Sequence, residues 1–310
     1  MADIVVLGSF MMDLVARSKR LPQNGETIVG NTFERNAGGK GANQAASIAK
    51  LGKEVSFIGM VGRDDFGEMA KDVLKGVGVD TEHLLNSSSI STGIGSVWVD
   101  EDGNNRIIII PGSNLAFSSA NLHEVEKVIK SAKILILQLE MDFSLILEAI
   151  NMAYAYQVLI LLNPAPARKL SRDVYKKVTY LTPNETELEI LSGMPTDTIE
   201  NVKAAANSLI RQGTKNIIVT LGDRGSVWVS QDGEVIIAKS KKVTAVDTVA
   251  AGDSFNGALA CGIIDGLDKR EVLDLANTVG ALTVTKNGAI QSLPTLNDVR
   301  AFIQNENDRK

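Results

Sequence analysis

Cysteine and histidine are scarce in this sequence of 310 residues, which contains one cysteine and two histidines. The single cysteine, Cys261, excludes an intrachain disulfide and a thiolate metal cluster, and it is typical of a protein in a reducing compartment. His83 and His123 fall in segments that are predicted to be polar, so the sequence predicts no zinc site.

An excess of positive charge and long apolar runs are also lacking. The formal net charge is −5, which argues against binding to nucleic acid or to a membrane surface. No apolar run is long enough to span a bilayer, and the first ten residues, MADIVVLGSF, predict a β-strand and no signal peptide. We therefore expect a cytoplasmic protein that binds neither nucleic acid nor membranes.

Two common phosphate-binding motifs are absent. The sequence has no G-x-x-x-x-G-K-[ST] motif, and Gly8, which ends the first apolar run, is followed by SFMMD and not by the rest of a G-x-G-x-x-G motif. These absences argue against a P-loop fold and against an ordinary dinucleotide-binding fold.

Short apolar runs alternate with helical patterns along most of the chain. Such alternation is typical of a parallel sheet that helices cover on both faces, in which ligands bind beyond the carboxyl ends of the strands. The sequence thus predicts an α/β fold with functional residues in the loops after residues 8, 139, 163, 182 and 222. Strands are expected at 4–8, 55–62, 134–139, 158–163, 178–184 and 216–222, and helices at 41–52, 67–78, 143–156 and 198–213.

Two segments depart from this alternation. Residues 14–36 contain turn signals and short alternating pieces, and residues 91–112 predict a hairpin around an Asp-Gly turn. We expect both segments to form a small β-sheet that lies as a lid over the strand ends. Two ordinary edge hairpins are the alternative that the pattern leaves open.

A glycine-rich stretch, NAGGKGANQAA (36–46), opens the first predicted helix. Gly39 and Gly41 would let the backbone approach a ligand closely, while Lys40 supplies a positive charge and Asn43 an amide that both donates and accepts. A polyhydroxylated ligand needs this mixture of groups. A glycine-rich loop without a function remains the alternative.

Acidic residues follow several of the predicted strands. Asp13 and Glu140 lie where a carboxylate could accept from sugar hydroxyls, although an acid in a loop is usually just solvated. Asn184 and Glu187 are three residues apart, which puts both on one helical face and suits a water-mediated magnesium contact, or else a helix cap. TLGDRG (220–225) is adequate for a nucleotide but common in α/β proteins.

The motif DTVAAGDSFNGALACG spans residues 247–262. Ala250, Ala251 and Gly252 leave the N–H groups at a predicted helix N-terminus uncovered, which favours the charge of a transferred phosphoryl group. Asp253 would then take the proton of the attacking hydroxyl. The alternative is an acid that only complements the helix dipole.

The stretches AGGKGANQA (37–45) and AVDTVAAGDSFNGAL (245–259) resemble the two signature motifs of the PfkB family of carbohydrate kinases, and the likeness runs along nearly the full length. The resemblance implies a single doubly wound α/β domain over residues 1–310, with a mostly parallel sheet flanked by helices and a small β-sheet lid. It also implies ATP-dependent phosphorylation of ribose at O5 with Mg²⁺, and a homodimer that pairs through the lids.

The resemblance further implies roles for individual residues, with Asp253 as the general base. The anion hole would consist of the backbone of Ala250, Ala251, Gly252 and Asp253. The sugar-site positions are Met11, Asp13, Gly39, Lys40, Gly41, Asn43, Glu140 and Asp253. The nucleotide-site positions are Asn184, Thr220, Gly222, Asp223, Arg224, Gly225, Gly252 and Asn277, with Glu187 in a magnesium-associated element. An activating potassium ion would be held, mostly by backbone carbonyls, at Asp247, Val249, Thr283, Lys286, Gly288 and Ser292.

Two positions depart from the family pattern. Met11 stands where family members often carry Asn, which removes a polar contact to the sugar, and Ala250 stands where many carry Gly. One alternative is therefore a family kinase that acts on a ketohexose, a 2-keto-3-deoxy acid or a nucleoside. An alternative of another class is a non-catalytic sugar sensor, which the intact Asp253 and Lys40 disfavour.

Overall fold

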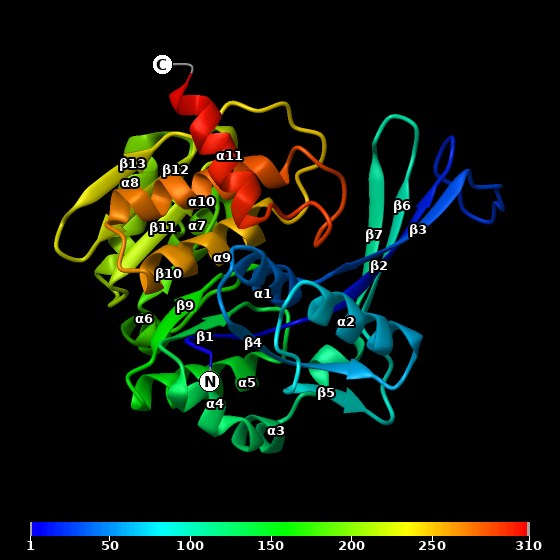
Figure 1. Ribbon diagram of the computed structural model, residues 1–310, viewed down its shortest axis with the longest axis horizontal. Coiled ribbons are helices and arrows are strands. Elements are labelled where there is room, and N and C mark those ends of the chain that lie inside the picture. Colours follow the sequence, from blue (N-terminus) through cyan, green and yellow to red (C-terminus); the bar gives the residue numbers. More distant parts are fainter. Residues whose placement is uncertain (1, 309–310) are drawn as a thin grey trace.

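The computed structural model describes residues 2–308 of the chain. A large central sheet carries helices on both faces, and a second, small sheet projects from one side (Figure 1). This architecture confirms the predicted α/β class, in which a mostly parallel sheet is flanked by helices and accompanied by a small β-sheet.

The central sheet contains nine strands in the order β13-β12-β11-β10-β9-β8-β1-β4-β5. Neighbouring strands are parallel except for the pairs β11–β12 and β12–β13. The strand order reverses between β1 and β8, so ligands are expected beyond the carboxyl ends of these strands. The bounds are β1 Ile4–Leu7, β4 Val55–Gly62, β5 Leu84–Ser87, β8 Ile134–Leu137, β9 Leu159–Leu162, β10 Tyr180–Leu181, β11 Asn216–Thr220, β12 Ser226–Ser230 and β13 Val235–Ala238.

The strands pack on both sides because alternate residues point to opposite faces. In β1, Ile4 and Val6 belong to one buried apolar cluster, and Val5 and Leu7 to the other. The first cluster is covered by α1 Lys40–Lys50, α2 Asp65–Gly76, α9 Ala251–Ile264, α10 Lys269–Thr283 and α11 Leu296–Asn307. The second is covered by α3 Ser119–Glu124, α4 Glu126–Ser131, α5 Phe143–Ala155, α6 Arg172–Lys177, α7 Glu185–Ser192 and α8 Ile199–Ile210.

The predicted strands agree with the structure where the apolar pattern is long. The strand predicted at 55–62 is β4 with the same bounds. The strand predicted at 178–184 is only the two residues of β10, because Pro183 lacks an N–H group and Asn184 caps α7. No helix within residues 2–308 combines the length and apolar character that a membrane crossing requires.

The small sheet contains four strands in the order β3-β2-β6-β7. The predicted hairpin at 91–112 is confirmed, since β6 and β7 are antiparallel around a turn in which Gly103 has φ 81°. β2 begins at Met11, so Asp13 lies within this small sheet. The sequence had suggested a loop at the edge of the central sheet. The bounds are β2 Met11–Arg17, β3 Thr32–Gly38, β6 Ile94–Val99 and β7 Asn105–Ile110.

Candidate active site

Helix α9 begins where the sequence predicted an anion-binding turn. Its N-cap residue, Ala250, has φ 61°, a left-handed conformation that costs a residue with a side chain about 1 kcal/mol or more. The N–H groups of Gly252 and Asp253 have no acceptor among residues 2–308, whereas that of Ala251 donates to the Thr248 carbonyl at 3.4 Å. Three of the four backbone donors from Ala250 to Asp253 therefore have no acceptor among residues 2–308.

The Asp253 side chain is buried and held by two amides from α1. Its Oδ2 accepts from Asn43 Nδ2 at 2.9 Å, and its Oδ1 accepts from Gln44 Nε2 at 3.2 Å. The nearby charge of Asp253 raises the pKa of Lys40, although burial partly opposes this shift. Lys40 therefore stays a cation beside this carboxylate.

A second acidic group lies at the carboxyl ends of β1 and β8. Glu140 accepts from the Ser9 hydroxyl and, at 3.1 Å, from the backbone N–H of Lys40. Burial raises the pKa of Glu140, while burial and the neighbouring Glu140 raise the pKa of Asp13 to about 6. Asp13, Lys40 and Glu140 thus form one partly buried polar cluster.

This cluster contains an unused acceptor. Asn43 Oδ1 is buried and has no hydrogen-bond partner in the described part of the chain. A Cβ atom added to Gly38 would lie 3.3 Å from Asp13 Oδ2 and 3.9 Å from Asn43 Oδ1, so glycine keeps the space between them open. A small ligand with hydroxyl groups could donate to both oxygens.

We expect Asp13→Asn to stabilise the ligand-free protein. The folded pKa of Asp13, about 6, lies above the ordinary 3.8. Below about pH 4 the carboxyl is neutral in both the folded and the unfolded state, so its burial costs no stability. As the pH rises through 6 the buried group must ionise, and the folded protein becomes less stable. At pH 8 the variant should unfold about 2–4 °C higher than the wild type, which corresponds to about 1 kcal/mol, and the gain should vanish near pH 4.

Thermal unfolding followed by circular dichroism across this pH range measures the effect. The control is Asp72→Asn on the exposed face of α2, which should shift the midpoint by less than about 1 °C at every pH. A variant at position 13 that is less stable than the wild type at pH 8 would contradict the prediction.

Two glycines of the stretch 36–46 approach the chain itself. A Cβ on Gly41 would lie 2.7 Å from the Gly8 backbone, and one on Gly39 would lie 2.8 Å from Met11 N. The sequence analysis expected these glycines to admit a ligand. They also allow α1 to begin in direct contact with the segment that joins β1 to β2.

A cavity of about 1130 Å³ lies at the N-terminus of α9. Gly252 lines it, and so does every other predicted nucleotide-site residue, namely Asn184, Thr220, Gly222, Asp223, Arg224, Gly225 and Asn277. Three lysines that were not predicted from the sequence, Lys239, Lys241 and Lys242, also line the cavity. This mixture of cations and polar groups suits a phosphorylated ligand.

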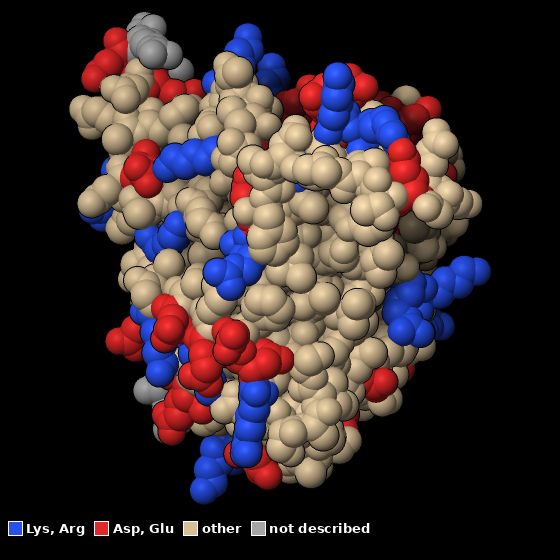
Figure 2. Space-filling view, turned by 90° about the vertical axis from the view of Figure 1, so that its right-hand side faces the viewer, with Lys and Arg blue, Asp and Glu red and all other residues tan. Residues whose placement is uncertain are grey.

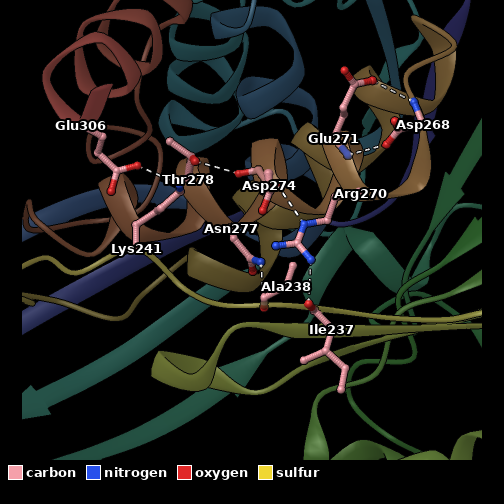
Figure 3. Close-up of polar contacts among 10 residues, drawn as sticks. All are labelled: Ile237, Ala238, Lys241, Asp268, Arg270, Glu271, Asp274, Asn277, Thr278 and Glu306. Carbon is pink, nitrogen blue, oxygen red and sulfur yellow. Dashed lines mark hydrogen bonds and ion pairs between the residues drawn. The ribbon is translucent and has the colours of Figure 1, made fainter. Parts of the chain in front are cut away.

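Figure 3 shows hydrogen bonds between side chains of α10 and the backbone of β13. The Asn277 side chain donates to the Ala238 carbonyl at 3.3 Å, and the Arg270 guanidinium donates to the Ile237 carbonyl at 3.0 Å. Lys241 pairs with Glu306 on α11 at 2.7 Å. The cavity wall is therefore tied to two helices distant in sequence from β13.

Asn184 and Glu187 form a helix cap. Asn184 is the N-cap residue of α7, and each side chain accepts from the backbone N–H of the other. The helix cap, which the sequence had left open as the alternative, is therefore the arrangement in the structure. Burial raises the pKa of Glu187, whose charge interacts with Lys40 and Asp253, so it belongs to the same site.

The residues predicted for potassium lie on two segments that Asp247 joins. Its two oxygens accept from the N–H groups of Val249 and Gly288, each at 3.0 Å. The carbonyl oxygens of Val249, Lys286 and Gly288 accept no hydrogen bond from residues 2–308. Free carbonyls of this kind fit a monovalent cation. Residues 2–308 contain no group of three acidic, histidine or cysteine side chains that could hold a metal.

Sequence analysis also missed the buried amides around Asp253. Gln138 and Asn163 directly follow β8 and β9, and both contact Gln44. A polar residue at the end of an apolar strand run was the available signal, since this is where parallel sheets place ligand sites.

Similar proteins are known. The family model for pfkB family carbohydrate kinases matches residues 1–296. A ribokinase of Schizosaccharomyces pombe is 40% identical over 308 residues, covering 96% of this chain and 97% of that protein. A deoxyribokinase of Salmonella typhi is 36% identical over 302 residues, covering 97% and 98%. The structure of Arabidopsis thaliana ribokinase complexed with ribose and ATP has 32% identity and a TM-score of 0.92, covering 97% and 98%.

Proposed function

The chain belongs to the pfkB family of carbohydrate kinases, and from this premise we propose that it transfers the terminal phosphoryl group of ATP to the O5 hydroxyl of ribose. The observation that carries the proposal is the position of Asp253. Its neighbour Gly252 lines the large cavity, while its own carboxylate is held beside Lys40, next to Glu140.

Asp253 takes the proton of O5 as this oxygen attacks the phosphorus atom. The new O–P bond forms while the bond to the ADP oxygen breaks, and negative charge develops on the transferred group. The free N–H groups of Gly252 and Asp253 donate to that charge, and the α9 dipole favours it. Lys40 adds a positive charge on the sugar side.

Ribose binds to the polar cluster at the base of the small sheet. The ionised Asp13 accepts from two vicinal hydroxyls, and Asn43 Oδ1 accepts from a third. Glu140 holds the backbone of Lys40 and thus the start of α1. These assignments leave no buried polar atom of the cluster without a partner once sugar is bound.

ATP occupies the large cavity, with its phosphates toward Gly252 and its remaining parts along the segment 220–225 and Asn277. Magnesium, when bound with ATP, offsets the charge of the phosphates. One oxygen of Glu187 caps α7, and the other is free among residues 2–308 to hold a magnesium-bound water.

The free carbonyls of Val249, Lys286 and Gly288 near Asp247 would hold an activating potassium ion. The ion would fix the segment that leads into Ala250 and thereby the backbone donors of α9. We expect kcat to be severalfold higher in potassium chloride than in sodium chloride of equal concentration. Equal rates in the two salts would remove the potassium assignment.

Two copies of the chain pair through their small sheets, which act as lids over the sugar. The strand β7 exposes four consecutive isoleucines, Ile107–Ile110, each 48–60% accessible. Ile108, Trp98 and Phe33 lie on one face of the sheet by register. Figure 2 looks onto the side from which the sheet projects, and its centre carries few charged side chains. An exposed apolar face of this kind fits a second copy.

We expect Ile108→Glu to convert the dimer into a monomer, because a carboxylate would be buried in the apolar interface. The dissociation constant should rise at least about 100-fold, measured by sedimentation velocity. Ile303→Glu is the matched control, since Ile303 is an exposed isoleucine on α11, away from the small sheet. A wild type that is monomeric at micromolar concentration would contradict pairing.

A second candidate substrate is 2-deoxyribose. A deoxyribokinase is among the similar proteins, and Met11 presents an apolar side chain on the same face of β2 as Asp13. An apolar side chain tolerates a sugar that lacks one hydroxyl, whereas the Asn common in the family would reject it.

A coupled ATPase assay with ribose, 2-deoxyribose, fructose, 2-keto-3-deoxygluconate and adenosine tests both candidates. We expect the highest kcat/KM with ribose, and Met11→Asn should raise the ratio of ribose to 2-deoxyribose. A preference of the wild type for 2-deoxyribose would replace the first candidate by the second. Turnover with fructose or adenosine alone would reject both.

A further inference from the structure

A buried line of amide side chains runs from β8 to Asp253. Gln138 Nε2 donates to Gln44 Oε1 at 2.6 Å, and Gln44 Nε2 donates to Asp253 Oδ1 at 3.2 Å and to Asn163 Oδ1 at 3.3 Å. All four residues are more than nine-tenths buried. We propose that Gln44, oriented by Gln138, is a positioning residue for Asp253, an inference that rests on the proposed function.

The orientation of the Gln44 amide is set from both sides. Gln138 Nε2 donates to the Gln44 oxygen, while Gln138 Oε1 is buried and has no partner among residues 2–308. Asn163 donates to the Thr182 carbonyl at 3.1 Å, so it presents its own oxygen, and the Gln44 NH₂ group must face that. The remaining N–H of Gln44 then points at the Asp253 carboxylate, which can only accept when ionised.

The backbone leaves room for this arrangement. A Cβ atom on Gly8 would lie 2.1 Å from Gln138 Oε1, so only glycine admits the Gln138 amide at this place. One turn after Asp253, a Cβ on Gly257 would lie 2.7 Å from Ser47 Cβ. The helices α1 and α9 therefore approach closely enough for Gln44 to reach Asp253.

Two amides fix the plane of the carboxylate. Asn43 donates to Oδ2 and Gln44 to Oδ1, so rotation of the Asp253 side chain would break at least one bond. In the proposed reaction the lone pair that takes the O5 proton must be aimed at the sugar. Because Gln44 is completely buried, it acts on the reaction through Asp253.

Gln44→Met, a variant of similar size without donors, tests the proposal. We expect kcat to fall about 10- to 100-fold, since a misplaced base is costly, while KM for ribose and for ATP stays within about threefold. Ser47→Ala is the matched control, because it removes the bond from Ser47 Oγ to the Ser254 carbonyl in the same helix contact. This control should keep kcat within about twofold.

Gln138→Glu tests the orientation itself. When ionised, the new carboxylate accepts from the Gln44 NH₂ group, which turns the Gln44 oxygen toward Asp253. When protonated, it donates to Gln44 as the native amide does. Relative to the wild type, kcat should therefore fall further as the pH rises from 6 to 8.5, without a parallel change in the unfolding temperature.

The outcomes separate this inference from the proposed function. If Gln44→Met keeps kcat within twofold while Asp253→Asn loses it, Gln44 does not position the base and only the inference falls. If Asp253→Asn keeps its kcat, the base assignment in the proposed function falls first, and the inference about Gln44 falls with it. Should Gln44→Met fail to fold, Gln138→Glu decides, and a pH-independent loss that follows the unfolding temperature would overturn the proposal.

Discussion

Asp253→Asn is expected to lower kcat by about 10²- to 10⁴-fold, the contribution of a general base, while KM for ribose and ATP stays within about threefold. The amide keeps the size of the side chain but cannot take the O5 proton. Asn43 and Gln44 each donate to one oxygen of Asp253, and the amide replaces one of these oxygens by an NH₂ group. One of the two donors would therefore face another donor. Steady-state rates in a coupled assay for ADP give the result.

The matched control is Asp265→Asn at the other end of α9. Asp265 is partly exposed and pairs with Lys53, so its substitution should change kcat by less than about twofold. Asp253→Ala, which leaves both amide donors without a partner, should be at least as slow as Asp253→Asn and less stable. A folded Asp253→Asn protein with wild-type kcat would exclude the base assignment and favour a different acid in the cluster.

The same variant addresses the sugar-sensor alternative. A sensor would bind ribose without hydrolysing or transferring phosphate, and its affinity for ribose would not depend on Asp253 as a base. Phosphoryl transfer by the wild type that disappears in Asp253→Asn, with ribose binding retained by calorimetry, separates the two classes of protein. Binding without transfer in both proteins would establish the sensor.

The fold could be predicted where the sequence pattern is local. β4 is a continuous apolar run bounded by polar residues, and its eight residues are all buried, so run and strand coincide. The β6–β7 hairpin followed from its Asp-Gly turn. Both features depend on neighbours within a few residues, which a single sequence contains.

Other elements depend on contacts that lie far along the chain. β10 shrinks to two residues because the cap of α7 begins at Asn184, and Asp13 belongs to the small sheet because β2 pairs with β6. The pairing between Asp13 and Gly95 spans about eighty positions and leaves no local signature. The strand pair β12–β13 and the helix α10 were not identified from the sequence.

The sequence indicated which kinds of group form the site, but not which residues contact one another. The motif at 247–262 indicated an open helix N-terminus with an acid, and α9 has one. The partners of that acid could not be predicted, since Asn43 lies 210 residues away. Gly39 and Gly41 were singled out because glycine lets a ligand approach the backbone, and the structure adds another reason for glycine there, which is close contact with the chain itself.

Because of that contact, Gly39→Ala is expected to lower the stability of the protein strongly. Gly39 has φ 92°, and an added Cβ would lie 2.8–2.9 Å from Met11 N, Phe10 Cα and Ser9 O, all backbone atoms that cannot rotate away. Left-handed strain of about 1–3 kcal/mol and overpacking of about 1–3 kcal/mol should together lower the free energy of unfolding by about 2–6 kcal/mol.

The loss of activity should exceed what stability alone explains. Gly39 is the N-cap of α1, which carries Lys40, Asn43 and Gln44, so a shift of its first turn moves the sugar site relative to Asp253. We expect kcat/KM for ribose to fall at least about 100-fold in the folded variant, because displacements near 1 Å are that costly. Urea unfolding and the coupled assay, both at a temperature where the variant is folded, give the two numbers.

Gly78→Ala separates the two causes. Gly78 has φ 93°, almost the value of Gly39, but its added Cβ would only touch Ala49 Cβ at 4.0 Å. It should therefore lose about 1–2 kcal/mol from backbone strain and keep its kcat/KM. The excess loss in Gly39→Ala then measures the clash with the segment between β1 and β2. Equal losses of stability in the two variants, with kcat/KM retained in both, would mean that the left-handed conformation alone requires glycine at position 39.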